Sequence, residues 1–290
     1  MIVKVIDLFC GMGGFSQGSK QSGAEVILAV DSWDKALQVH EQNHPKCKHL
    51  KWELGSKSPK ETWKDILQEI GLHRDHLHIH GSPPCQNFSG ANPHRNHENG
   101  MHLVEWFLEL IRVSRCDSWS MEESSSKRIG QLLNENKIPW KLLNFQDYGV
   151  SQTRKRYIAG IGFNFEDFTR SHPKTLRQVF SQSKRNLGTL DIVVVSPAAF
   201  KKNVRKNIRE LDEISPTVCA SRSGHILDSK TLKRIDYISF RENLILQTFP
   251  ISYKMGSLSK TDKQKLIGNA VPPKIAENIM KSILHRARKK

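Results

Sequence analysis

Apolar residues in the first half of the chain occur as short runs that alternate with stretches of helical periodicity. Residues 2–9 and 24–30 are rich in Val, Ile, Leu and Ala, a composition typical of buried strands. Residues 34–43 and 101–113 instead repeat apolar side chains at the spacing of a helix. Because strands that alternate with helices form parallel sheets covered on both faces, the pattern predicts an α/β fold built on a doubly wound, Rossmann-like sheet.

The strand pattern continues beyond residue 70 and then weakens. Further strands are expected at residues 76–80, 119–121 and 157–162. From about residue 164 to residue 240 only short apolar runs remain, and they lie between basic stretches. This change of pattern predicts a separate, smaller domain.

The composition narrows the class of protein. The 290 residues include 12 Phe and 6 Trp, which excludes a disordered chain and allows a sizeable core. No apolar run approaches the roughly 18 residues that cross a bilayer, and Lys4 and Asp7 interrupt the amino-terminal segment, so we expect neither a membrane span nor a signal peptide. Five scattered cysteines without a C-x-x-C pair argue against a disulfide scaffold. We expect a soluble monomer of a reducing compartment, namely the cytoplasm, or the nucleus if the cell is eukaryotic.

Positive charge is concentrated in the second half of the chain. Residues 1–150 hold 17 Lys and Arg against 18 Asp and Glu, whereas residues 151–290 hold 28 against 11. The basic second half favours a nucleic acid as the partner, because each phosphate that a Lys or Arg side chain neutralises releases counterions. Charge alone is equally compatible with a solvated basic face.

A glycine turn follows the first predicted strand. Gly11, Gly13 and Gly14 come directly after it, and Asp31 ends the next strand about 20 residues later, where a carboxylate suits a ribose hydroxyl pair. The third Gly of a dinucleotide-binding turn would fall at Ser16. A nucleoside ligand without a pyrophosphate therefore stays open. The pattern is equally compatible with a turn that has only a structural role.

Cys85 differs from the other cysteines in its surroundings. It follows two prolines in the segment GSPPCQNFSG, at the end of a predicted strand. The prolines restrict the backbone and keep it out of a helix, so the thiol can be presented to a ligand. The other four cysteines are more typical of small buried apolar residues.

Five segments carry a resemblance that extends over nearly the whole chain. They are DLFCGMGGFS (7–16), GSPPCQNFS (81–89), DYGVSQTRKRYIAGI (147–161), RENLILQTFP (241–250) and GNAVPP (268–273). In this order and approximate spacing they resemble the motifs of the DNA (cytosine-5) methyltransferases. The resemblance implies a catalytic domain of residues 1–163 plus 255–290, a small basic target-recognition domain of residues 164–254, double-stranded DNA as the partner, and a place in restriction–modification.

The chemistry of that family explains the residue types. Carbon 5 of cytosine is a poor nucleophile, but a thiolate that adds to carbon 6 makes carbon 5 enamine-like and able to accept a methyl group. Stacking hides the ring face, so the base has to leave the duplex. The resemblance makes Cys85 the nucleophile and Glu122 the acid at ring N3. It also implies that Arg154 and Arg156 contact the cytosine and orient Glu122.

The resemblance implies S-adenosyl-L-methionine as the cofactor. It adds Phe9, Pro84 and Asn269 to the residues found from the glycine turn. It also places Glu53 near the adenine, although the motif there is poorly matched. The expected contacts are Asp7, Phe9, Gly11, Gly13, Gly14, Asp31, Glu53, Pro84 and Asn269.

One departure from the family pattern lies beside Glu122, where Glu123 and Ser124 replace the usual Asn-Val. It leaves open a catalytically impaired DNA- or cofactor-binding protein. The tRNA-methylating branch of the family is a second alternative, although the C-F-T segment of that branch is absent. His76, His78 and His80 share one face of a predicted strand, but no fourth ligand accompanies them, and we expect no metal site.

Overall fold

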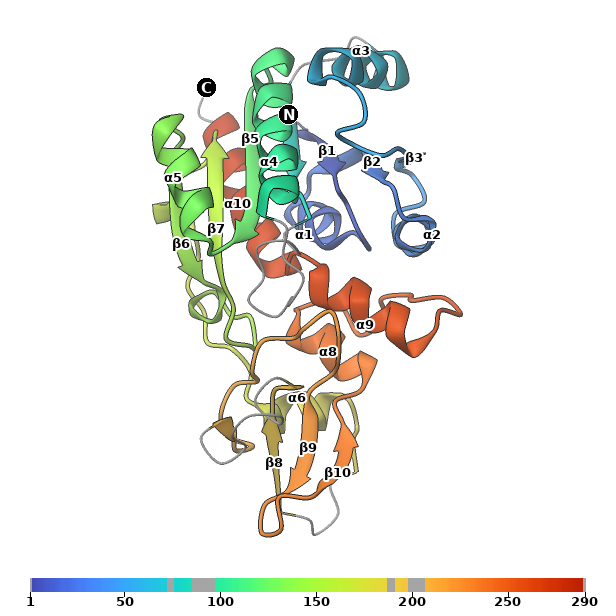
Figure 1. Cartoon of the computed structure of the whole chain (residues 1–290), viewed down its shortest axis with the longest axis vertical. Helices are drawn as coiled ribbons and strands as arrows, with labels where there is room; N and C mark the ends of the chain where they lie inside the picture. Colours follow the sequence, from blue (N-terminus) through green and yellow to red (C-terminus); the bar gives the residue numbers. More distant parts are fainter. Residues whose placement is uncertain (1, 72–75, 85–96, 187–190, 198–206, 289–290) are drawn as a thin grey trace.

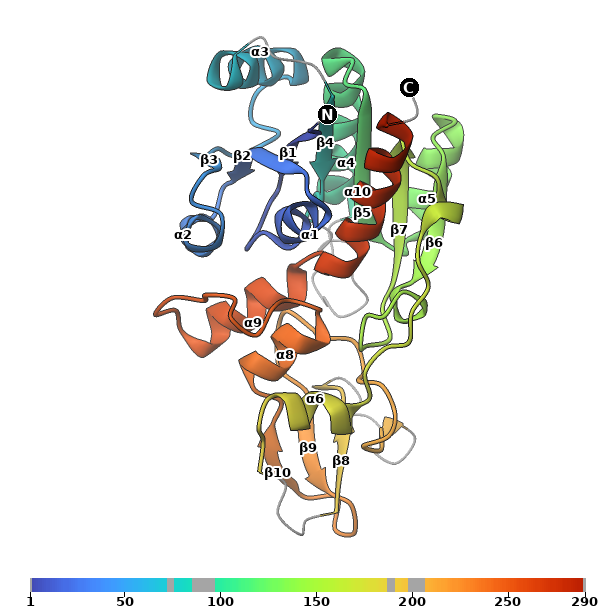
Figure 2. The same cartoon turned by 180° about the vertical axis from the view of Figure 1, so that it is seen from behind.

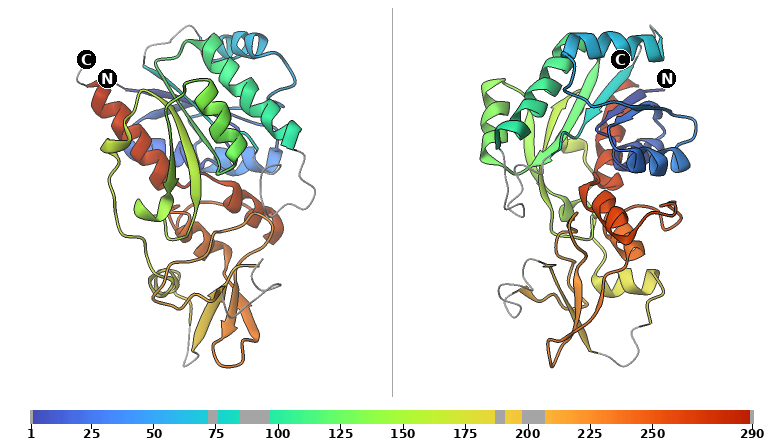
Figure 3. Two further views of the ribbon diagram at one scale, coloured as in Figure 1. Left: turned by 60° about the vertical axis from the view of Figure 1, so that its left-hand side comes forward. Right: turned by 45° about the vertical axis from the view of Figure 1, so that its right-hand side comes forward.

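The computed structural model describes residues 2–71, 76–84, 97–186, 191–197 and 207–288. Two sheets lie at opposite ends of an elongated molecule, with two helices between them (Figure 1). Two further views show the same separation (Figure 3). In the described part of the chain no helix is long and apolar enough to cross a membrane.

The larger sheet has seven strands in the order β3-β2-β1-β4-β5-β7-β6. Their bounds are β1 (Lys4–Leu8), β2 (Glu25–Asp31), β3 (Lys48–Lys51), β4 (Leu77–Gly81), β5 (Ser118–Ser124), β6 (Trp140–Asn144) and β7 (Lys155–Ile161). The first five of these strands pair in parallel, as predicted. β7 runs antiparallel to both its neighbours because only residues 145–154 join it to β6, and a parallel crossover needs a dozen residues or more.

Helices cover both faces of this sheet (Figures 1 and 2). One face packs against α3 (Pro59–Ile70), α4 (His97–Ser114) and α5 (Lys127–Glu135). The other packs against α1 (Gly14–Ser22), α2 (Asp34–Asn43) and α10 (Pro273–Ala287). Buried Phe107 and Phe15 lie in the cores of the two faces. The α/β, doubly wound prediction is therefore confirmed.

The last helix returns to the first one. A Cβ placed on Gly18 would lie 2.3 Å from the carbonyl oxygen of Pro273, so only glycine lets α1 and α10 approach this closely. Pro273 begins α10, where its missing N–H costs no helical hydrogen bond. This contact brings the carboxyl-terminal segment beside the glycine turn.

The smaller sheet is antiparallel. Its strands are β8 (Ile192–Val195), β9 (His225–Asp228) and β10 (Arg234–Tyr237), with β9 in the centre. The helices α6 (Leu176–Gln182), α8 (Phe240–Leu246) and α9 (Lys260–Asn269) share one buried apolar cluster with it. Because the same cluster contains Met12 and Val39 of the larger part, the domain boundaries at residues 163/164 and 254/255 stay a prediction. Two 3-10 turns complete the described elements, at Phe145–Asp147 and Phe165–Asp167.

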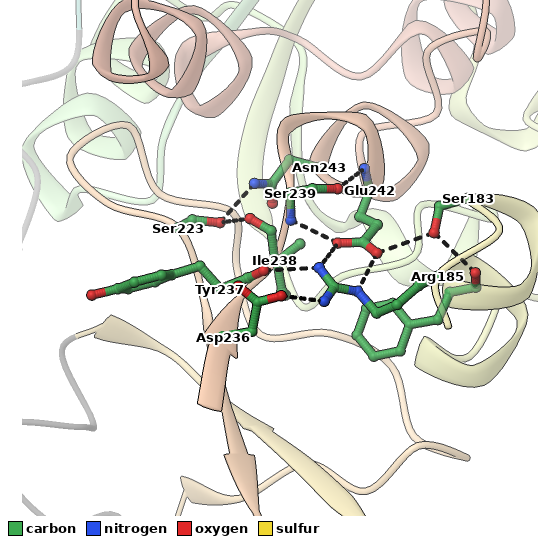
Figure 4. Close-up of polar contacts among 10 residues, drawn as sticks. Ser183, Arg185, Ser223, Asp236, Tyr237, Ile238, Ser239, Glu242 and Asn243 are labelled. Carbon is green, nitrogen blue, oxygen red and sulfur yellow. Dashed lines mark hydrogen bonds and ion pairs between the residues drawn. The ribbon is translucent and has the colours of Figure 1, made fainter. Parts of the chain in front are cut away.

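An ion-pair network around the buried carboxylate of Glu242 holds α8 to the smaller sheet (Figure 4). The Arg185 guanidinium donates to both carboxylate oxygens of Glu242, and its Nη2 lies 2.8 Å from Oε2. The same guanidinium donates to Asp236 and to the Tyr237 carbonyl oxygen. Glu242 also accepts from the Ser239 backbone N–H, so its buried carboxylate is fully engaged.

Arg185→Met is expected to lower the free energy of unfolding by about 3 kcal/mol, because it leaves the Glu242 carboxylate buried without a cation. Urea unfolding measures this loss. Arg177→Met is the matched control, since Arg177 pairs with Asp212 at an exposed site and such pairs contribute about 1 kcal/mol or less. Equal losses in the two variants would contradict the prediction.

Candidate active site

The glycine turn lies at the carboxyl end of β1. Phe9 and Gly11 both have left-handed backbones, with φ of 56° and 54°, a costly conformation for the non-glycine residue. The Gly11 N–H donates to Oδ2 of Asp31 at 2.8 Å, which ties the turn to the end of β2. No atom of the described residues lies within 4 Å of a Cβ placed on Gly11, so the described part of the chain leaves room for a ligand on this side of the turn.

The Asp31 carboxylate is held in place by backbone groups. Its Oδ1 accepts from the Trp33 N–H at 2.9 Å while Oδ2 accepts from Gly11. Burial raises the pKa of Asp31 from its ordinary value. Each carboxylate oxygen retains a lone pair, and a ribose diol has two hydroxyl donors, so the residues present fit a nucleoside.

Gly13 and Gly14 serve close packing. A Cβ on Gly14 would lie 2.0 Å from the carbonyl oxygen of Val271, and one on Gly13 would lie 2.8 Å from Cδ2 of His40. These glycines therefore let the turn approach the segment before α10 and the helix α2.

Asp7 is fully buried beneath the turn. Its Oδ2 accepts from Ser16, from the backbone N–H at 3.1 Å and from the hydroxyl at 2.6 Å. Burial raises the pKa of Asp7 to about 7. Ser16, which stands where a dinucleotide-binding turn has its third Gly, thus satisfies a buried carboxyl. Asp7 thus supports the turn from below, and its predicted contact with the cofactor stays a prediction.

Glu122 and the two predicted arginines meet at the same edge of the sheet. Glu122 lies on β5 and is almost fully buried. Its Oε1 is 3.3 Å from Nε of Arg156 and 3.9 Å from Nη2 of Arg154. Arg154 directly precedes β7 and Arg156 lies at the start of that strand, two residues further on, so extended backbone directs both to one face. The structure therefore brings these three predicted residues together.

Arg154 also connects the site to the segment before α10. Its Nη1 donates to the Gly268 carbonyl oxygen at 3.1 Å. Beside it, the Gln152 amide donates to Oε1 of Gln247 at 3.0 Å, and Gln247 donates to the Ile267 carbonyl oxygen. No local pattern in the sequence marks Gln247, because only the fold brings α8 and α9 together at Gln152.

The remaining predicted residues lie at or near the same edge. Pro84 is exposed just beyond β4, Glu53 is exposed after β3, and Asn269 is exposed at the end of α9. Parallel strands end at one edge, so this convergence follows from the fold. Cys85 lies outside the described residues.

The predicted face of three histidines is only partly formed. His78 and His80 lie on β4 and are buried, with ring nitrogens 2.8–2.9 Å from the Ser118 and Ser120 hydroxyls. His76 is exposed and precedes the strand. Serine hydroxyls thus account for the polar atoms of the two buried rings.

Glu123 is buried on the face of β5 opposite to Glu122. It pairs across the sheet with Tyr157, whereas Glu122 pairs with Ile158. Its Oε2 accepts from the Ser124 N–H, and its Oε1 has no hydrogen-bond partner among the described residues. Burial, together with the neighbouring Glu122 charge, raises the pKa of Glu123 to about 8. The site thus carries a second, neutral carboxyl at neutral pH.

Glu123→Gln is expected to remove a pH dependence of stability. Because the folded pKa of about 8 exceeds the unfolded value near 4.5, the wild-type contribution is present below pH 4.5 and is lost as the pH rises towards 8. Between pH 6 and pH 7.5 the wild type should lose about 2 kcal/mol of unfolding free energy relative to the variant. Urea unfolding at both pH values checks this. Exposed Glu109→Gln should follow the wild type, and parallel curves for wild type and Glu123→Gln would contradict the prediction.

Comparison with known proteins agrees with this geometry. The family model of C-5 cytosine-specific DNA methylases matches residues 3–122 and 162–285. The type II methyltransferase M.HindV of Haemophilus influenzae is 27% identical, over 98% of this chain and 97% of that protein. M.HgiDI of Herpetosiphon aurantiacus is also 27% identical, over 94% and 92%.

Solved structures of low identity share the fold. A protein described as a DNA modification methyltransferase, encoded in an Escherichia coli prophage, has a TM-score of 0.70 at 18% identity, over 99% of each chain. The Dnmt2 methyltransferase of S. pombe has a TM-score of 0.68 at 15% identity, again over 99% of each. The family model spans most of the chain, and this protein belongs to the C-5 cytosine-specific DNA methylase family.

Proposed function

We propose that this DNA methyltransferase acts on a cytosine flipped out of double-stranded DNA, through a covalent bond between Cys85 and carbon 6 of the ring. The observation that carries the proposal is the buried carboxylate of Glu122 within 4 Å of the guanidinium groups of Arg154 and Arg156. Planar cations around a buried carboxylate suit a planar base whose edge forms hydrogen bonds.

S-adenosyl-L-methionine is the methyl donor of the family, and it supplies an electrophilic methyl carbon. We propose that Gly11 and Asp31 hold its nucleoside part. The open space at Gly11 and the fixed carboxylate of Asp31 support this role. Phe9, Pro84 and Asn269 are proposed to complete the contacts, and Glu53 remains a prediction.

The residues of the chain have separate tasks in the proposed reaction. The Cys85 thiolate forms a bond to carbon 6, and the electron pair moves towards carbon 5. Glu122 hydrogen-bonds ring N3 and stabilises the charge that develops in the ring. Arg154 and Arg156 hold Glu122 in place. After carbon 5 carries the methyl group, its proton leaves to a base, the ring double bond re-forms, and the Cys85 thiolate is expelled.

We propose that the end of the molecule with the smaller sheet binds the DNA backbone. Exposed basic side chains on and around this sheet support the proposal, namely Arg222, Lys230, Lys233, Arg234 and Arg241. DNA affinity should then fall steeply with added salt, as counterion release requires. A monomeric state and a cytoplasmic location stay predictions.

The test is transfer of tritiated methyl groups to mixed-sequence duplex DNA, with tRNA as a parallel substrate. Label should enter the DNA, and sequencing the modified cytosines identifies the target. A target duplex with 5-fluorocytosine should then trap a covalent complex, because fluorine cannot leave as the carbon-5 proton does. Label in tRNA but not in DNA would overturn the duplex proposal. Tight DNA binding without turnover, restored by Glu123→Asn, would instead support an impaired enzyme.

A further inference from the structure

A second polar cluster lies directly behind Gly13, apart from the residues of methyl transfer. His40, His44, Cys47 and His49 fall within ten positions, at the end of α2 and the start of β3. One ligand atom each from His40, Cys47 and His49 lies within 4.8 Å of the others. The His40 Nδ1 and the His49 Nε2 are 2.8 Å apart.

Ser16 lies between Asp7 and His40 and indicates which nitrogen of His40 carries its proton when Asp7 is ionised. The Ser16 hydroxyl is 2.6 Å from Oδ2 of Asp7, and its single proton then points to that carboxylate. The Ser16 oxygen then accepts from Nε2 of His40 at 2.9 Å. With its proton on Nε2, neutral His40 presents a lone pair at Nδ1.

His49 faces the same place, because its Nε2 lies 2.8 Å from the His40 Nδ1. When His40 carries its proton on Nε2, the lone pair of its Nδ1 is directed at His49. The positive species between the two nitrogens is then either a proton of His49 or a bound cation.

The neighbouring sulfur favours a metal ion over a proton. A proton needs only the two nitrogens, whereas the Cys47 sulfur lies beside them as a third ligand atom. A Cys47 thiolate offsets one of the two charges of a divalent ion, which lowers the cost of burying the ion. Imidazole and thiolate ligands suit zinc.

We propose that His40, Cys47 and His49 bind a zinc ion, with water or His44 as the fourth ligand. The His44 ring centroid lies 4.7 Å from that of His40. Tetrahedral zinc places its nitrogen ligands about 3.3 Å apart, so the two rings separate by about half an ångström on binding. The Cys47 thiol proton, now directed to the Lys48 carbonyl oxygen at 3.3 Å, is released to solvent.

The bound ion would be structural. It ties the end of α2 to β3 behind the glycine turn, since His40 is the residue that a Cβ on Gly13 would strike. Its hydrogen bond through Ser16 to Asp7 orients the His40 ring, as a carboxylate commonly does for a metal-bound imidazole. This role is independent of the methyl-transfer chemistry.

Cobalt titration of the full-length protein, after dialysis against a chelator, tests the site. We expect one Co²⁺ per chain, with a thiolate-to-cobalt charge-transfer band and the d–d bands of a four-coordinate ion, all displaced by zinc. Zinc at about 100 times its Kd should raise the melting temperature by about 5 °C.

Substitutions of the proposed ligand residues test which side chains bind the metal ion. Cys47→Ser should lose the charge-transfer band, and His49→Gln should weaken cobalt binding at least about 10-fold. Cys116→Ser and His285→Gln are matched controls away from the cluster and should keep both. A charge-transfer band that persists in Cys47→Ser overturns the proposal. So does a melting temperature that zinc and chelator leave unchanged, which would assign the positive species as a proton. None of these measurements depends on methyl transfer.

Discussion

Cys85→Ala is expected to reduce methyl transfer at least about 10⁴-fold, equivalent to about 5.4 kcal/mol on the barrier. Without a thiolate bond at carbon 6, carbon 5 of cytosine does not become nucleophilic enough to take the methyl group. The assay is tritium transfer to duplex DNA that contains the target sequence, under single-turnover conditions. Binding of cofactor and DNA should be retained, since the substitution removes only a sulfur atom.

The other cysteines supply the controls. Burial raises the pKa of Cys116 to about 11 and also raises the pKa of Cys219, so both remain thiols at neutral pH. A thiol is a far weaker nucleophile than a thiolate. Cys116→Ala and Cys219→Ala should therefore transfer methyl groups within a few-fold of the wild type. Substantial activity in Cys85→Ala, or its loss in either control, would remove Cys85 from the proposed role.

Glu122→Gln is expected to lower the rate of methyl transfer by about 10²- to 10⁴-fold, the usual size of a general-acid contribution. The amide keeps the shape of the side chain but lacks the acid function that stabilises negative charge at ring N3. Single-turnover rates should fall while the Kd for duplex DNA changes little. An unchanged rate would show that another group acts at N3.

Stability needs its own control here, because Arg154 and Arg156 lose their shared counter-charge in Glu122→Gln. Glu122→Asp keeps the charge but shortens the side chain, and it should also be slow while unfolding at nearly the wild-type urea concentration. Glu123→Gln alters the adjacent carboxyl and should stay within about tenfold of the wild-type rate at pH 7. If Glu123→Gln were as slow as Glu122→Gln, the two carboxyls would have to share the task.

The sequence predicted the elements of the larger sheet because their patterns are local. The helix expected at residues 34–43 is α2 (Asp34–Asn43), with the same bounds. The strand expected at residues 24–30 is β2 (Glu25–Asp31). Each depends on apolar residues at a spacing that one face of the sheet then buries.

The smaller sheet was harder to predict from the sequence. β10 is exposed along its whole length, so no alternation of buried and exposed positions marks it in the sequence. Arg185 and Glu242 are far apart in the chain, and only the packing of α8 against the smaller sheet makes them partners.

The functional residues divide in the same way. The Gly turn and the Pro-Pro-Cys segment are local signals. The sequence alone identified them, because each requires a special backbone geometry. The resemblance supplied Glu122, Arg154 and Arg156, but not their distances. Asp7 and Gly14 stay predicted cofactor contacts, and the structure adds that Asp7 is buried against Ser16 and that Gly14 packs closely against Val271.

The sequence by itself determined the fold class and the order of the motifs, and its resemblance to the family predicts Cys85 as the nucleophile. The tertiary structure alone decided that Glu122 lies against two arginines, that Glu123 is buried on the opposite face of β5, and that His40, Cys47 and His49 converge behind Gly13. The reason is physical. Periodicity and backbone restriction act between neighbours in the chain, whereas burial, charge pairing and ligand geometry depend on which distant segments the sheet brings to one edge.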